Sequence, residues 1–117
     1  MSKLESFKKQ FSEAVQRFDE VLKEKKTIIV RDAAIKRFEF TFDLAWKLIR
    51  AYLREKKGIE CPSPKDCIQA AYRHGLIEYD EIWVQITDWR NEAVHIYSEK
   101  YEEKLYQDLP RVLPLFQ

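Results

Sequence analysis

The segment that ends at Gly58 constrains the fold of this chain more than any other. Apolar residues recur along it at helical spacing, and neither glycine nor proline interrupts residues 28–57. At about 100° per residue, one stripe is made of Ile35, Phe38, Phe42, Ala45, Trp46, Ile49 and Leu53. A second apolar arc, largely on the far side, consists of Phe40, Leu44, Leu48 and Ala51. A helix that is apolar on two sides is buried on two sides, so it is either the centre of a bundle or half of a subunit interface.

Local capping signals predict four further helices. The signals are the S-x-x-E box of Ser2 and Glu5, the pair Ser63 and Pro64, and the single residues Asp80 and Ser98. The helices that follow them cover about residues 3–25, about residues 64–73, a segment after Asp80, and about residues 99–115. The central helix begins between Ile28 and Ala33 and ends before Gly58, Gly75 closes the short helix, and Pro110 should kink or end the last one.

The scarcity of turn residues supports long helices rather than many short strands. Only two glycines and four prolines occur in 117 residues. We therefore expect an all-α fold, an antiparallel four-helix bundle with an additional short helix, as a single domain over residues 1–117. Within it, Phe42, Trp46 and Trp89 should be buried, whereas Trp83 should lie at the flank of the core stripe and line a cleft.

Composition excludes several classes of protein. The net charge is +1, so a nucleic-acid contact would need a local basic patch. No apolar run approaches the roughly 20 residues of a membrane span, and residues 1–10 lack a signal-peptide core, so a cytoplasmic protein is expected. In that compartment Cys61 and Cys67 should be reduced thiols, and their spacing does not suggest a metal site.

Candidate chemistry is concentrated in residues 88–97. The chain has no Gly-rich phosphate loop, H-E-x-x-H, paired C-x-x-C or G-x-S-x-G, and His74 sits before Gly75, where a helix dipole favours it structurally. Arg90, Asn91, His95 and Tyr97, by contrast, bring a cation, an amide, an imidazole and a phenol within eight residues. This set suits a phosphodiester, because Arg binds the phosphoryl oxygens and His moves a proton near neutral pH.

The spacing of Arg90 and His95 leaves this interpretation open. Five residues apart in a continuous helix, the two side chains point about 140° away from each other. A solvated helix face explains the same residues. A joint site requires either that the helix end near His95 or that a second copy of the chain bring its own Arg90.

Several motifs together resemble the nucleotidyltransferase substrate-binding protein family, which is part of the HEPN superfamily of helical bundles. They are residues 38–47 (FEFTFDLAWK), Ser63–Pro64, residues 71–77 (AYRHGLI) and residues 88–91 (DWRN). Arg90 to His95 matches the family's R-x4-H motif, and Tyr97 completes its extended R-x4-H-x-Y form. The likeness extends from the first helix to about Leu109.

The resemblance implies a homodimer that works with a separately encoded minimal nucleotidyltransferase. In many such pairs the helical subunit is a toxin, a metal-independent ribonuclease that needs no cofactor and carries its Arg and His in the dimer cleft. Arg90 and His95 would then be catalytic, Asn91 supporting, and Tyr97 the residue to which the partner transfers AMP. The alternative is a non-catalytic subunit that binds substrate for the nucleotidyltransferase. A purely structural adaptor is a third option, but it would not need the Arg90, His95 and Tyr97 set.

Overall fold

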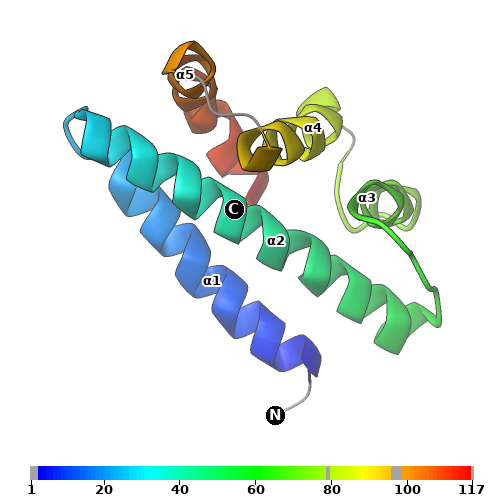
Figure 1. The fold of residues 1–117 in the computed structure, drawn as a ribbon. Helices are drawn as coiled ribbons and strands as arrows, with labels where there is room; N and C mark the ends of the chain where they lie inside the picture. The colour runs from blue at the N-terminus through cyan, green and yellow to red at the C-terminus, as the bar shows by residue number, and fades with distance from the viewer. Residues whose placement is uncertain (1–2, 79, 96–98, 117) are drawn as a thin grey trace.

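The computed structural model describes residues 3–78, 80–95 and 99–116, with the side chains of all of these except 91–95 and 99. Within these ranges the chain forms five helices and no strand (Figure 1). They are α1 (Lys3–Leu22), α2 (Ile28–Lys57), α3 (Pro64–Arg73), α4 (Glu81–His95) and α5 (Glu99–Phe116). The expected all-α bundle is confirmed.

Helix α2 is the centre of the bundle. It runs alongside α1 for most of its length, and it also contacts α3 and α5 (Figure 1). The hydroxyl of Thr27 caps its first turn by accepting a hydrogen bond from the amide of Val30 at 3.0 Å. Gly58 ends it with a φ of 66°, a left-handed conformation that glycine adopts without a steric penalty.

The predicted helix boundaries are close to the observed ones, with two exceptions. Ser63 caps α3 by accepting from the amide of Asp66, and Asp80 caps α4 by accepting from the amide of Ile82. Helix α1 ends at Leu22, three residues before the expected position. Helix α5 does not end at Pro110, because its helical conformation continues past Pro110 and Pro114 to Phe116. The predicted caps Ser2 and Ser98 lie outside the described residues.

The core combines aliphatic side chains from all five helices with a group of aromatic rings at its centre. Phe18 of α1, Phe38 and Phe42 of α2 and Phe116 of α5 are almost fully buried and are linked by ring contacts. Trp83 belongs to this core and is only 5% exposed, so it does not lie at the flank as predicted, and it does not line the hollow that contains Arg90. The reason is the C-terminal turn of α5, where Phe116 packs edge-on against the indole at 5.9 Å.

The other two tryptophans are less buried than expected. Phe42 is fully buried as predicted, but Trp46 and Trp89 are half-buried and pack against the core from its margin. Trp46 has one face under the guanidinium of Arg50, at 5.2 Å from the ring centroid. The register assigned to the central helix is nevertheless the observed one, since Trp46 remains in contact with the core.

A buried arginine joins α2 to α5. Arg31 is 1% exposed, and its guanidinium donates to Glu103 of α5 at 3.3 Å and to the neighbouring Asp32 at 3.1 Å. Glu103 also accepts from Lys26, and that bond holds the pKa of the Glu103 carboxyl below its ordinary value. A charge buried this deeply needs such partners, so the pairing fixes where α5 crosses α2.

Cys61 and Cys67 form a disulfide, with the two sulfur atoms 2.01 Å apart, which corrects the expectation of reduced thiols. The turn after Gly58 and the first turn of α3 bring the two Cα atoms to 5.1 Å, within bridging distance. Both residues are buried in a small second core with Leu53 and Ala70. The compartment argument did not take this three-dimensional proximity into account.

Within the described ranges, no helix has both the length and the apolar character needed to cross a lipid bilayer.

We predict that the disulfide contributes about 2 kcal/mol to the free energy of unfolding, the value expected for so short a closed loop. The Cys61→Ser, Cys67→Ser double variant should therefore unfold at a lower urea concentration than the oxidised wild type. Dithiothreitol should destabilise the wild type to a similar extent and leave the variant unchanged. Two titratable thiols in the native, unreduced wild type would contradict the assignment.

Candidate functional site

Arg90 on α4 is held by Asp43 on α2. Its Nη2 atom lies 3.1 Å from one carboxylate oxygen of Asp43 and 3.4 Å from the other. Both side chains are about one-third exposed, so the pair is accessible from solvent yet only partly screened by it. A charge-assisted contact of this kind fixes the guanidinium at the surface of the bundle, and Arg90 is thereby positioned before any ligand binds.

The pair forms part of a groove of about 580 Å³, which we call the Arg90 groove. Its walls come from three helices: Asp43, Trp46 and Lys47 of α2, the start of α3 at Ser63–Lys65, and Thr87 and Arg90 of α4. The groove therefore combines one aromatic ring, three basic side chains and one carboxylate. That composition can bind an anion that also carries an apolar or planar group.

The wall formed by α3 is held in place on both sides. Lys65 pairs with Asp88 of α4 at 2.9 Å, which ties the first turn of α3 to the helix that carries Arg90. On the other side, the disulfide between Cys61 and Cys67 closes the loop that contains Ser63, Pro64 and Lys65. The local sequence thus fixes three residues of the groove by covalent and ionic constraints.

Glu39 lies beside the Arg90–Asp43 pair and is half-buried. Burial raises the pKa of its carboxyl above the ordinary value, and the nearby Asp43 raises it further. Lys36 and Arg90 oppose this shift by favouring the charged form, but they do not cancel it. The surroundings of Arg90 are therefore a balanced set of charges rather than a basic patch.

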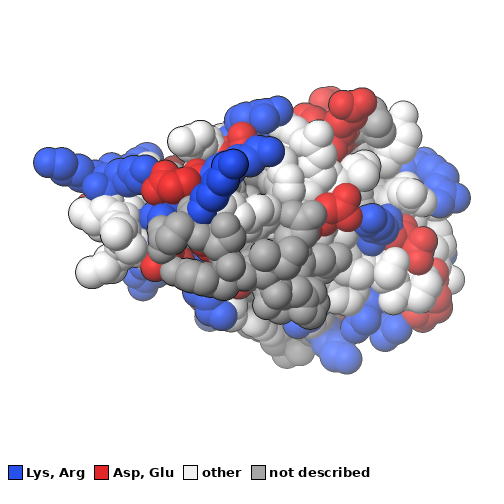
Figure 2. All heavy atoms as spheres, turned by 45° about the horizontal axis from the view of Figure 1, so that its top comes forward, with Lys and Arg blue, Asp and Glu red and all other residues white. Residues whose placement is uncertain are grey.

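The wider surface has the same mixed character. On the face shown in Figure 2, which α4 and α5 turn toward the viewer, lysines and arginines are interspersed with acidic residues. This agrees with the chain's net charge of +1. Any selectivity for an anionic ligand must come from particular side chains and not from the overall field.

The structure describes only one of the predicted site residues completely. Arg90 lies in the groove described above, and the backbones of Asn91 and His95 are on α4, with His95 as its last residue. The side chains of Asn91 and His95, and all of Tyr97, lie outside what the structure describes. Sequence reasoning missed the role of Asp43, although this residue stands in the middle of the FEFTFDLAWK motif.

Comparison with known proteins assigns the chain to a family. The family described as "Nucleotidyltransferase substrate binding protein like" matches residues 2–117, and the chain belongs to this family of the HEPN superfamily. The family description implies a nucleotidyltransferase as partner.

Two relatives show how far the similarity extends. A Haemophilus influenzae protein named "Probable ribonuclease HepT" is 30% identical over 80 residues, which cover 65% of this chain and 55% of that protein. The chain therefore matches only about half the length of this relative. A crystal structure of a protein from Thermus thermophilus superimposes with a TM-score of 0.84 at 37% identity, over 91% of this chain and 92% of that one.

The raised pKa of Glu39 predicts how stability depends on pH. Folding favours the protonated carboxyl, so the contribution of Glu39 to stability is largest below its ordinary pKa of 4.5 and is lost as the pH rises through the higher folded value. Glu39→Gln, which is uncharged at every pH, should therefore have a higher Tm than the wild type at pH 7, and the difference should shrink toward pH 4.

The matched control is Glu55→Gln, an exposed position on the same helix, which should follow the wild type at both pH values. A Glu39→Gln protein that is less stable than the wild type at pH 7 would show that ion pairing with Lys36 and Arg90 outweighs the burial of the carboxylate.

Proposed function

We propose that this chain is a metal-independent endoribonuclease that acts as a homodimer, the toxin of a toxin–antitoxin pair. The observation that carries the proposal is Arg90, whose guanidinium is fixed by Asp43 at the wall of an open groove. Arg90 begins the R-x4-H motif on α4, and the same helix reaches His95. The name of the Haemophilus influenzae relative, a probable ribonuclease, supports the same reaction class.

In this proposal each residue of the motif has one role. Arg90 binds the non-bridging oxygens of a phosphodiester and stabilises the charge that develops on them. The 2′-oxygen of the preceding ribose attacks the phosphorus, and the bond from phosphorus to the 5′-oxygen breaks. His95 acts as general base or general acid in this transfer. Asn91, four residues before His95, orients the imidazole or holds the RNA backbone.

A homodimer would bring Arg90 and His95 together in spite of their spacing of five residues along one helix. In a continuous helix, side chains five residues apart face directions about 140° from each other, which favours a site shared between two chains, although α4 ends at His95. A two-fold axis near α4 would place two copies of the motif in one cleft, with Arg90 of one chain opposite His95 of the other. The Arg90 groove is open on the surface of one chain and is available for this arrangement.

The partner nucleotidyltransferase would silence the ribonuclease by transferring AMP from ATP to the Tyr97 hydroxyl, which loses its proton while pyrophosphate leaves. Two residues after His95, the modified tyrosine would bring a phosphate and an adenine close to Arg90. The new anion would pair with the guanidinium and occupy the space that RNA needs.

A second candidate is the non-catalytic subunit that binds substrate for a nucleotidyltransferase. The description of the family favours it. In this role Arg90 would bind the phosphate of a nucleotide without cleaving anything.

Cleavage of RNA by the purified protein separates the two candidates. We expect the wild type to cut single-stranded RNA in the presence of EDTA. His95→Ala should cut it about 10²- to 10⁴-fold more slowly, because a positioned acid or base contributes a factor of this size. Arg90→Lys should lose much of the activity, since it keeps the charge but not the guanidinium geometry. His74→Ala is the control, because His74 is the other, exposed histidine of the chain. Equal rates for His95→Ala and His74→Ala would move the assignment to the substrate-binding role.

The proposed silencing is tested at Tyr97. Tyr97→Phe should keep ribonuclease activity but escape inhibition by the partner, because it lacks the hydroxyl that accepts AMP. Mass spectrometry after incubation with the partner and ATP should show AMP on the wild type and none on the variant, and a growth assay should show persistent toxicity. AMP on another residue, or a Tyr97→Phe protein that is still silenced, would refute the mechanism.

A further inference from the structure

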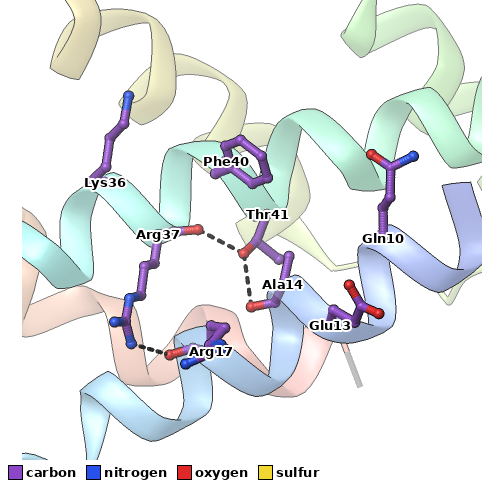
Figure 3. Close-up of a pocket in the computed structure, with 8 residues that line it drawn as sticks. All are labelled: Gln10, Glu13, Ala14, Arg17, Lys36, Arg37, Phe40 and Thr41. Atoms are coloured by element: carbon purple, nitrogen blue, oxygen red, sulfur yellow. Dashed lines mark hydrogen bonds between the residues drawn. The ribbon is translucent and has the colours of Figure 1, made fainter.

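A second groove of about 590 Å³ lies between α1 and α2, away from α3 (Figure 3). We call it the Phe40 groove, because the ring of Phe40 stands at its edge and is 60% exposed. Most other phenylalanines of the chain lie in the core or pack against it: Phe11, Phe18, Phe38, Phe42 and Phe116. Phe40 was expected in the second apolar arc of α2 but is exposed, and it is not among the residues that pack against the core.

Basic side chains surround this ring. Arg17 of α1 and Lys36 and Arg37 of α2 line the groove, against a single carboxylate, that of Glu13. Figure 3 shows Lys36 and Phe40 rising from the same side of α2, with Arg37 directed toward α1. The local charge is therefore positive, although the chain as a whole is nearly neutral.

The floor of the groove is rigid. Arg37 donates a hydrogen bond from Nη1 to the carbonyl oxygen of Arg17 at 2.8 Å, and the buried hydroxyl of Thr41 contacts the carbonyl oxygen of Ala14 at 3.3 Å. These bonds tie α1 to α2 beneath the ring and fix one guanidinium in the wall. The side chain of Arg17 extends into solvent, with a 3.9 Å contact to Glu20.

The Phe40 groove and the Arg90 groove share one face of α2. Lys36, Phe40, Asp43 and Lys47 are spaced at intervals of four, three and four residues, so they lie along one line of the helix surface. Phe40 is about one helical turn from Asp43, the residue that holds Arg90. A strand of RNA lying along this line would pass from the ring to the guanidinium within the length of one or two nucleotides.

We propose that the Phe40 groove is a subsite for single-stranded RNA, in which one base stacks on Phe40 and the flanking phosphates bind Arg17 and Lys36. The proposal rests on the ribonuclease function and names the part of the substrate next to the scissile phosphate. An exposed aromatic ring between basic side chains is the pattern by which proteins bind single strands without reading their sequence. The subsite would add the three basic side chains of this groove to those of the Arg90 groove along the path of the strand.

Binding of a fluorescent single-stranded RNA oligonucleotide to the His95→Ala protein tests the subsite without cleavage. In that background, Phe40→Ala should weaken binding about tenfold, the effect of losing one base stack, whereas Phe40→Tyr should bind as the parent does. Lys36→Gln should make binding less sensitive to salt. The slope of the logarithm of the binding constant against the logarithm of the salt concentration should fall in magnitude by about one. Tyr72→Ala is the matched control, since Tyr72 is a half-exposed aromatic on α3 that lines a different groove.

The outcomes separate this inference from the proposed function. If the wild type cleaves RNA but Phe40→Ala and Tyr72→Ala bind it equally well, the subsite is refuted and the ribonuclease assignment stands. If neither cleavage nor binding occurs, both fail. Equal affinity for duplex RNA would exclude stacking. A Phe40→Ala protein that sediments as a monomer while the parent is a dimer would also overturn the inference, because Phe40 would then belong to the subunit interface.

Discussion

The packing of the main apolar stripe of α2 holds the bundle together, whereas the second arc predicted from the sequence is only partly buried, with Phe40 60% exposed. The main stripe packs against α1 and α5 through Phe38 and Phe42, and Leu44 is buried as well. One line of exposed and half-buried residues along this helix carries Lys36, Phe40, Asp43 and Lys47. These side chains project from the longest helix that the structure describes. Asp43 can therefore hold Arg90 of α4 in a defined position, and the proposed site takes its geometry from the core.

Local signals predicted the helices well, because capping and periodicity act within a few residues. Helix α2 begins at Ile28, at the edge of the predicted range, with Thr27 as its cap. Ser63, Pro64 and Asp80 start α3 and α4 as expected. Tertiary contacts produced the errors. Trp83 looked peripheral on its own helix and is buried by Phe116, which is 33 positions further along the chain. The pairing of Cys61 with Cys67 depends on how the turn after α2 folds back, and this is not visible in their spacing.

The candidate site was predicted only in part, for the same reason. The Arg and His of the motif are close together in the sequence and could be found there, whereas the Asp43 contact joins residues 47 positions apart. The contact with Asp43 changes how Arg90 can bind a phosphate. A guanidinium that already faces a carboxylate is oriented without a ligand, but a phosphate must compete with or share that contact. A second groove with basic side chains on the same helix would therefore help to bind an RNA strand.

We propose that Arg90 of one chain and His95 of its partner form one ribonuclease site. Mixing two inactive proteins, Arg90→Ala and His95→Ala, tests it most directly, after unfolding and refolding them together so that the subunits exchange. The account predicts recovery of about one quarter of the wild-type cleavage rate, since half of the randomly paired dimers are mixed and each has one intact site. If the wild type is active and the mixture stays inactive although mixed dimers form, the shared site is contradicted.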